Sequence, residues 1–192
     1  MILMGKIQQI SASTRWHRKF HRLVASALMV FFFFVSITGL MLGWKKNSNG
    51  LLLAESKQGS STQLSDWLSI DSLNTIAINV LRDSVDAALS AETDRIDIRP
   101  SKGMVKFTFK EHFNAIQLDA STGKVLMLEK RRADWIEKLH DGSILDHYAG
   151  FSGQPFKLLY TSMMGVGLFF LSLTGFWLWY NPKRIRKQKS HK

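Results

Sequence analysis

Two long uncharged runs dominate the hydrophobic pattern of the chain. One covers residues 23–44 and the other covers residues 158–180, and neither contains Asp, Glu, Lys or Arg. A helix needs about 20 apolar residues to cross the roughly 30 Å hydrocarbon core of a bilayer, and both runs satisfy that length. The pattern therefore predicts two membrane-spanning helices with a polar segment between them.

The first run is better explained by an uncleaved anchor than by a signal peptide. It is longer than the roughly 7–15 apolar residues of a signal peptide, and the chain continues as GWKKNSNG without a small-residue cleavage site. We therefore expect the first helix to remain in the membrane.

The segment between the runs changes character along its length. Residues 45–70 are polar and rich in Gly and Ser, which predicts a flexible linker. Apolar residues at helical spacing then predict a helix over about residues 73–90, with Asp71 or Ser72 as its N-cap. Alternation of apolar and polar residues predicts short strands within residues 95–100, 104–110, 113–120 and 124–130. One helix over a small antiparallel sheet is an α+β arrangement.

These patterns divide the chain into consecutive parts. They are a basic N-terminal segment (1–22), a first span (23–44), the linker (45–70), an α+β domain (71–130), a membrane-proximal segment (131–157), a second span (158–180) and a basic tail (181–192). The predicted fold class is thus a membrane protein of α+β type, in which two transmembrane helices flank the folded domain.

The distribution of charge predicts the orientation of the chain. The formal net charge is +11, and the two terminal segments carry all of this surplus, because residues 1–22 and 181–192 contain basic residues and no acid. Positively charged flanks stay on the cytoplasmic side of a membrane. We therefore expect both termini to be cytoplasmic and residues 45–157 to lie outside, in the periplasm of a bacterial cell with an inner membrane.

The composition also narrows the chemistry. The chain contains no Cys, which excludes disulfides and thiolate metal sites within it. The surplus of basic residues indicates the orientation of the chain in the membrane and an attraction to lipid headgroups. No base-reading motif accompanies it, so nucleic acid is not an expected partner. No catalytic triad, phosphate-binding loop or dinucleotide fingerprint is present.

Several stretches resemble a known family. The alternating strand and turn IQLDASTGKVLMLEK resembles the closing hairpin of a PepSY domain. RKFHR followed by the first run, and LHDG followed by the second run with its T-G-x-x-x-W end, resemble the membrane helices of the PepSY-associated transmembrane family. The resemblance covers about residues 15–187. It implies an extracytoplasmic PepSY-like domain between the spans. Larger members have four or so spans and are associated with b-type haem and ferric-siderophore reduction, so this chain resembles a minimal two-span form.

The two spans also resemble each other. Ser36-Ile37-Thr38-Gly39 in the first span matches Ser172-Leu173-Thr174-Gly175 in the second. A Thr-Gly pair suits close helix packing, and a second interpretation is that Gly39 and Gly175 leave room for a flat cofactor between helices. The spacing of Gly39 and Gly43 is also a G-x-x-x-G pattern. The expected helix-packing residues are Thr38, Gly39, Gly43, Thr174 and Gly175.

Four histidines lie at the predicted membrane edges. His17 and His21 precede the first span and share one helix face, and His140 and His147 precede the second span. Haem iron takes axial imidazole ligands, so one pair at each face would suit transmembrane electron transfer. Neighbours at i and i+4 cannot reach opposite faces of one haem. A haem on the inner side therefore requires a homodimer or another membrane subunit, whereas His140 and His147 could converge if the chain turns at Gly142.

Other interpretations of these residues remain open. Histidines and basic or aromatic residues at a membrane edge also serve as anchors, and Trp44, Trp177, Trp179 and Tyr180 are typical of interface belts. A zinc site from His140, Asp141, Asp146 and His147 would use acceptable ligand types. His112, in a predicted turn, and His191, in the tail, are expected to be surface residues.

Two functions follow from these observations. The first is haem-b-dependent electron transfer through His21 and His140, supported by His17 and His147, which passes electrons outward to a ferric chelate. The alternative is a non-enzymatic, membrane-anchored PepSY module that binds or regulates an exported peptidase, or an accessory subunit of a membrane complex. Whether the chain is an enzyme is left open by its sequence.

Overall fold

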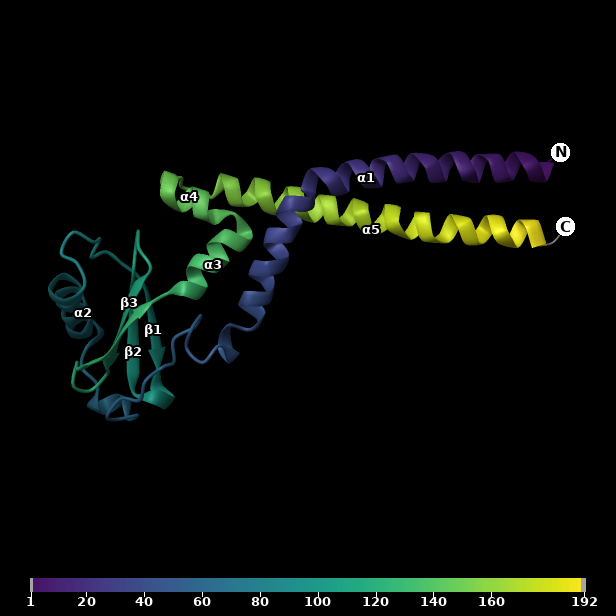
Figure 1. Ribbon diagram of the computed structural model, residues 1–192. Coiled ribbons are helices and arrows are strands. Elements are labelled where there is room, and N and C mark those ends of the chain that lie inside the picture. The colour runs from purple at the N-terminus through teal and green to yellow at the C-terminus, as the bar shows by residue number, and fades with distance from the viewer. Residues whose placement is uncertain (1, 191–192) are drawn as a thin grey trace. The chain divides into compact units, whose positions relative to one another are not determined.

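Two helices of unusual length begin and end the chain. In the computed structural model, which describes residues 2–190, helix α1 covers Ile2–Gly43 and helix α5 covers Pro155–Ser190. Residues 1–37 and 140–192 form one compact unit, in which α1 and α5 run side by side with both ends of the chain at the same end of the pair (Figure 1). Residues 38–139 form the second unit, the sheet domain. His191 lies outside the described residues, so its expected surface position stays a prediction.

The apolar surface of α1 and α5 faces outward. Both helices are long and apolar enough to cross a membrane, and only 11% of the most apolar window of each is buried. A core helix of a soluble protein would bury such residues, whereas a helix in lipid exposes them. Both helices also continue beyond the uncharged runs into the basic terminal segments, because residues 2–22 contain no helix-breaking Pro and Pro182 alone interrupts the later pattern.

The sheet domain has the predicted α+β arrangement. Helix α2 (Ile70–Ser84) precedes strands β1 (Thr93–Arg99), β2 (Met104–Phe109), β3 (Asn114–Asp119) and β4 (Val125–Lys130), and the strands form one antiparallel sheet in the order β1-β2-β3-β4. The predicted strands are therefore confirmed.

Helix α2 begins and ends earlier than the sequence predicted. Its N-cap is Ser69, whose Oγ accepts a hydrogen bond from the backbone N–H of Ser72 at 3.1 Å, so the expectation of Asp71 or Ser72 as the cap was wrong. At the other end, the Asp86 carboxylate accepts the backbone N–H of Ala88 and forms a turn in place of a further helical turn.

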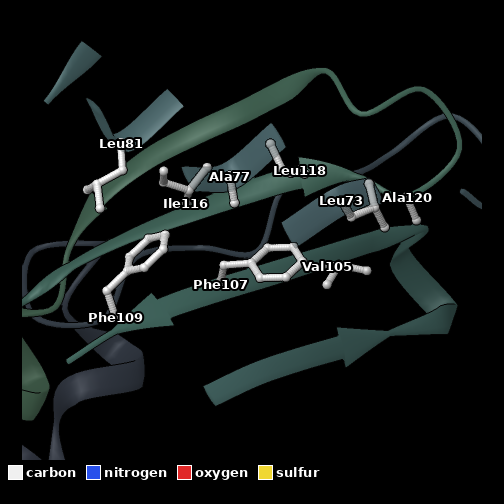
Figure 2. Close-up of a cluster of buried hydrophobic side chains, with 9 residues drawn as sticks. All are labelled: Leu73, Ala77, Leu81, Val105, Phe107, Phe109, Ile116, Leu118 and Ala120. Carbon is white, nitrogen blue, oxygen red and sulfur yellow. The ribbon is translucent and has the colours of Figure 1, made fainter. Parts of the chain in front are cut away.

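One face of the sheet forms the hydrophobic core. Figure 2 shows side chains of β2 and β3 facing the apolar stripe of α2. The nine fully buried members of this cluster are Leu73, Ala77, Leu81, Val105, Phe107, Phe109, Ile116, Leu118 and Ala120. The alternation of β2 and the helical spacing of α2 place these residues on matching faces, as the pattern predicted.

The other face of the sheet is polar, and the segment predicted as a flexible linker covers it. The amide side chain of Gln117 accepts the backbone N–H of Lys57 at 3.0 Å and donates to the carbonyl of Glu55 at 3.1 Å. A buried ion pair between Lys106 and Glu129 (2.9 Å) lies on the same face. Residues 55–60 are therefore ordered against the sheet, and their polar composition reflects a polar partner surface.

Asp119 fixes this covering segment to the turn after β3. One carboxylate oxygen accepts the backbone N–H groups of Ser121 and Thr122, and the other accepts the backbone N–H and the hydroxyl of Ser60. The covering segment also approaches the backbone before β2 closely at Gly59, where a Cβ would overlap the carbonyl oxygen of Gly103. The expected Asp-Thr-Gly reverse turn is present, with Gly123 at φ +71°.

His112 is buried rather than exposed, which corrects its prediction as a surface residue. Its side chain is 8% exposed. Nδ1 accepts the backbone N–H of Asn114 at 3.2 Å, so Nε2 donates to the carbonyl of Ser90 at 3.0 Å. The turn folds back onto residues that precede β1, and both ring nitrogens are used for structure.

Two short helices lead from the sheet domain toward the second long helix. Helix α3 covers Arg132–Asp141 and helix α4 covers Ser143–Ala149. The first turn of α3 is attached to the sheet domain by Ala133, whose backbone N–H donates to the carbonyl of Leu52 at 3.0 Å. Short 3₁₀ turns at Lys45–Asn47, Leu64–Asp66 and Pro100–Lys102 complete the described elements.

Candidate functional site

The helix pair is joined by three layers at regular spacing. The layers pair Thr14 with Asn181, His21 with Thr174, and Leu28 with Gly167, with the α1 residue named first in each pair. Successive layers are seven residues apart on both helices. A seven-residue repeat keeps one face of each helix against its partner, as in a coiled coil. The antiparallel register pairs the first layer residue of α1 with the last one of α5. We call this line of contacts the seam.

His21 lies in the middle layer. Its Nδ1 is 2.8 Å from Oγ1 of Thr174, and the Thr174 hydroxyl also lies 2.7 Å from the backbone carbonyl oxygen of Phe170. A carbonyl oxygen only accepts, so the single hydroxyl proton is donated to Phe170 and the oxygen accepts from His21. The proton of a neutral His21 ring is therefore on Nδ1, and the lone pair is on Nε2.

The second ring nitrogen of His21 has no protein partner in the part of the chain that the structure describes. Next to the ring, a Cβ built on Gly175 would lie 3.7 Å from Cε1 of His21, which is ordinary contact. The side chain itself is partly buried. His21 is thus held in place through Nδ1, and Nε2 carries the lone pair of the neutral ring.

His17 shows the same tautomer by a different contact. Its Nδ1 lies 2.7 Å from the backbone carbonyl of Ser13, which can only accept, so Nδ1 carries the proton. The ring lies near Trp177 on α5, with centroids 6.2 Å apart, and near Trp16 at 5.1 Å. His17 and His21 lie one turn apart on α1, as predicted.

The layer on the side of the chain termini is polar and buried. The side-chain amide of Asn181 donates to Oγ1 of Thr14 at 3.1 Å, and Thr14 donates in turn to the carbonyl of Ile10 at 2.7 Å. Asn181 is 3% exposed and Thr14 is 7% exposed. A satisfied polar pair of this kind fixes the register of two packed helices.

The third layer is apolar and tightly packed. A Cβ at Gly167 would overlap Cδ1 of Leu28, whereas a Cβ at Gly165 would meet no atom within 4 Å. Gly167 therefore provides the close approach of the helices. This glycine was missed by the sequence analysis, although its distance of seven residues from Thr174 was a usable signal.

The glycines and threonines predicted for packing lie in different surroundings. Thr174 and Gly175 both border His21, whereas a Cβ at Gly43 would meet no atom within 4 Å. Thr38 and Gly39 are partly buried in the last turns of α1. Thr174 is thus the member of the Ser-x-Thr-Gly echo that contacts a candidate histidine.

His140 and His147 lie at a sharp corner before α5. His140 is near the end of α3 and His147 is in α4, and the chain turns between them at Gly142, as predicted, with φ +80°. A Cβ at Gly142 would lie 2.9 Å from the side chain of Tyr160, so the turn requires glycine. Both imidazoles are partly buried.

Asp146 and Asp141 stabilise this corner. Asp146 is 3% exposed, and its two carboxylate oxygens accept the backbone N–H groups of Phe156 (3.0 Å) and Lys157 (2.8 Å), which caps the start of α5. Asp141 pairs with the Lys157 ammonium at 2.8 Å and accepts the hydroxyl of Ser143 at 2.6 Å. Among the described residues, no group of three or more His, Cys, Asp or Glu side chains could hold a metal ion.

The sheet domain contains a cavity with a volume of about 580 Å³. Apolar side chains of Met41, Leu51, Phe113 and Trp135 line it. Basic side chains join them from the end of β4 and the start of α3, namely Lys130, Arg131 and Arg132. The Arg131 guanidinium donates hydrogen bonds to the backbone carbonyls of Phe109 and His112 and to the carboxylate of Asp134. Lys130 and Arg132 are exposed. The cavity suits a molecule with apolar parts and negative charge.

Comparison with known proteins identifies one family. A family model described as the PepSY-associated TM region matches residues 18–192, which includes α1 from Arg18 onward, the sheet domain and α5. No curated protein and no solved structure matches the chain. The match supports a location in a membrane, in agreement with the exposed apolar surface of α1 and α5.

Proposed function

Since the chain belongs to the family of the PepSY-associated TM region, we propose that it carries electrons across a membrane through haem b and delivers them to a ferric chelate. His21 holds haem iron on the side of the termini, and His140 holds it on the other side, with His17 and His147 as neighbouring imidazoles. When bound, haem b supplies one-electron redox chemistry at its iron.

The observation that carries this proposal is the orientation of His21. A histidine that binds a metal commonly uses one ring nitrogen as the ligand and donates its other N–H to a fixed acceptor, which sets the tautomer and the ring orientation. Thr174 is such an acceptor for Nδ1 of His21 at 2.8 Å. The Nε2 lone pair is thereby ready for iron, and Gly175 keeps the space beside the ring free of a side chain.

A haem held by His21 requires a second imidazole from outside the chain. Thr174 lies level with His21 and is 19 residues from Pro155, where α5 begins near the His140 corner. That separation is about 28 Å along a helix, so His21 and His140 cannot bind one iron within a single chain. A second copy of this chain, or another membrane subunit, supplies the opposing ligand.

The electron acceptor fits the cavity of the sheet domain. Ferric chelates with carboxylate or catecholate groups combine negative charge with apolar or aromatic parts. Lys130 and Arg132 provide positive charge at the edge of the cavity, and Trp135 provides an aromatic surface. We assign this cavity as the place where the chelate binds.

The charge distribution supports one orientation in a bacterial inner membrane. The described part of α1 and α5 contains no Asp or Glu, and apart from Lys157 the basic residues of both helices gather at the ends that carry the chain termini. With these ends in the cytoplasm, the sheet domain lies in the periplasm, where ferric chelates arrive.

An absorption spectrum of the detergent-purified, full-length protein tests the proposal. Protein from haem-replete cells is expected to show a Soret band that shifts on reduction. His21→Ala and His140→Ala should each lower the haem content. Asn181→Leu is the matched control, because it disrupts the adjacent layer of the seam without removing an imidazole, and it should retain haem.

A colourless wild-type protein from haem-replete cells would refute the electron-transfer proposal. In that case the non-enzymatic interpretation stands, in which the sheet domain binds or regulates another exported protein and the helices serve as anchors. Equal haem loss in Asn181→Leu and His21→Ala would show that the seam, rather than the imidazole, is required.

A further inference from the structure

A basic groove runs between α1 and α5 near their terminal ends. Its volume is about 450 Å³, and Ser11, Arg15 and Arg18 of α1 and Ile185 and Arg186 of α5 line it. It borders the Thr14–Asn181 layer of the seam, because Thr14 also lines it. The groove therefore lies where the pairing of the two helices is fixed by polar contacts.

Among the described residues, no carboxylate pairs with the three arginines of the groove. No Asp or Glu occurs before Glu55 or after Asp146 in the sequence. In the unit that contains the helices, Asp141 pairs with Lys157 and Asp146 caps α5, so neither is available. The described contacts include no ion pair for these guanidinium groups, and Arg15 and Arg18, at i and i+3 on one helix, repel each other.

The residue types favour a phosphate group as the missing anion. Arginine presents several N–H donors in a planar fork that matches the oxygens of phosphate, and the groove contributes three such side chains with a hydroxyl at Ser11. Apolar Ile185 forms part of the wall, which suits a phosphate that is attached to a lipid.

The depth of the groove matches lipid headgroups. Arg18 is five residues before the first uncharged run, and Arg186 is six residues after the second. These separations correspond to about 8 to 9 Å along a helix axis, and Arg15 is about 12 Å before the first run, so the groove lies at the outer edge of the headgroup region. Long basic side chains at this depth reach lipid phosphates readily.

We propose that this groove binds the phosphate of an anionic phospholipid and that the bound lipid joins α1 to α5 beside the polar layer of the seam. The shared ligand chemistry is a phosphate ester or a free phosphate, and we assign the lipid. The inference is independent of haem binding, since the groove shares no residue with the proposed iron ligands.

Native mass spectrometry of the full-length protein in detergent tests this assignment. Phosphatidylglycerol, phosphatidylcholine and inorganic phosphate are titrated at equal concentrations. We expect phosphatidylglycerol to bind at least about tenfold more tightly than phosphatidylcholine, and inorganic phosphate not to compete at the same concentration.

Variants separate the groove from general positive charge. The triple variant Arg15→Gln, Arg18→Gln, Arg186→Gln should lose at least about tenfold in phosphatidylglycerol affinity. The control Lys19→Gln, Arg22→Gln, Lys189→Gln removes as many charges from each helix and should stay within about twofold. The single variant Arg186→Lys keeps the positive charge but loses the planar guanidinium fork. It should weaken phosphatidylglycerol binding less than Arg186→Gln does. The part of the affinity that Arg186→Lys still loses measures the contribution of the fork geometry, in a chain that folds normally.

Equal loss of affinity in the two triple variants would overturn the proposal, because diffuse charge would then explain binding. Equal binding of phosphatidylcholine would do the same. Displacement of phosphatidylglycerol by an equal concentration of inorganic phosphate would overturn the lipid assignment and leave an anion site.

Discussion

Nδ1 of His21 lies 2.8 Å from Oγ1 of Thr174, although the two residues are 153 positions apart in the sequence. Hydrogen bonds between membrane helices contribute about 0.6 kcal/mol on average, so this one adds little to the stability of the helix pair. Its larger effect is on the ring, because it places the proton on Nδ1 and leaves Nε2 to bind a ligand.

The first prediction therefore concerns Thr174→Val, which keeps the shape of the side chain and removes the acceptor. We expect haem affinity to fall by about 10-fold to 100-fold while the protein remains folded, because the His21 ring loses its fixed orientation. Titration of haem into the apoprotein measures the change. Thr174→Ser should retain affinity, and Thr38→Val in the first span is the matched control. Unchanged affinity in Thr174→Val would contradict the role assigned to this contact.

The second prediction concerns the apolar layer of the seam. Gly167→Leu places a side chain where Leu28 already lies, and overpacking of this kind costs about 1–3 kcal/mol. We expect a lower thermal unfolding temperature of the purified protein, with recovery in the double variant Gly167→Leu, Leu28→Ala. Gly165→Ala, at a position with open space, should have no such effect. If Gly165→Ala lowered the unfolding temperature as much as Gly167→Leu does, the helix register described above would be contradicted.

The sheet domain was predictable because its signals are local. Alternation along residues 104–109 and helical spacing along α2 each involve neighbouring residues, and both directly indicate which face is buried. The segment at residues 55–60 was misinterpreted as a flexible linker for a related reason. It hydrogen-bonds to Gln117, which in turn bonds to Glu129 of the buried Lys106–Glu129 pair. Polar composition indicates exposure only when the partner surface is not itself polar.

The seam was not predictable from hydropathy alone. Its layers join residues about 140 to 170 positions apart, and the outermost layer uses Thr14 and Asn181, which lie beyond the uncharged runs. A repeat with alternating steps of four and three residues was available as a signal on α5, through Tyr160, Met164, Gly167, Leu171, Thr174, Leu178 and Asn181. The candidate histidines were found because they are few, whereas the acceptor for His21 required the structure.

The third prediction is a pH dependence that arises from Asp119. Burial raises the pKa of the Asp119 carboxyl, but hydrogen bonds from Ser60, Ser121 and Thr122 outweigh burial, so the net pKa lies below its ordinary value of 3.8. A carboxyl with a lowered pKa in the folded state stabilises the fold above its unfolded pKa, and this contribution disappears as the pH falls through the folded pKa.

Hydrogen exchange of β2 and β3 amides in the full-length protein measures this dependence. Protection should decrease as the pH is lowered below about 4. Asp119→Asn should reduce protection at neutral pH, because its side-chain NH₂ cannot accept from Ser60, and it should weaken the acid dependence. Asp66→Asn, at an exposed position, is the control. An acid dependence that is the same with and without Asp119 would contradict this prediction.

The fourth prediction concerns the cavity of the sheet domain. If Lys130 attracts an anionic ferric chelate, Lys130→Gln should raise the KM for chelate reduction about two- to fivefold with little change in kcat, because an exposed charge contributes up to about 1 kcal/mol to binding. Lys124→Gln removes a charge from the β3–β4 turn outside the cavity and should leave KM unchanged. Steady-state assays at low and high ionic strength provide a second check, since the effect should shrink with added salt. Equal KM changes in the two variants would exclude the cavity as the binding site.

The fifth prediction tests the orientation on which the proposed direction of electron flow depends. Lys46 is exposed just beyond α1, and Lys189 is exposed near the end of α5. Because the basic ends of both helices favour the cytoplasm, trypsin added to spheroplasts should cut within residues 45–157 and leave epitope tags at both termini intact. Trypsin added to inverted membrane vesicles should remove both tags and spare the sheet domain. The two preparations control for each other, since every cleavage site is present in both. Protection of the sheet domain in spheroplasts, together with its cleavage in inverted vesicles, would reverse the orientation, and electrons could then not reach a periplasmic chelate through this chain.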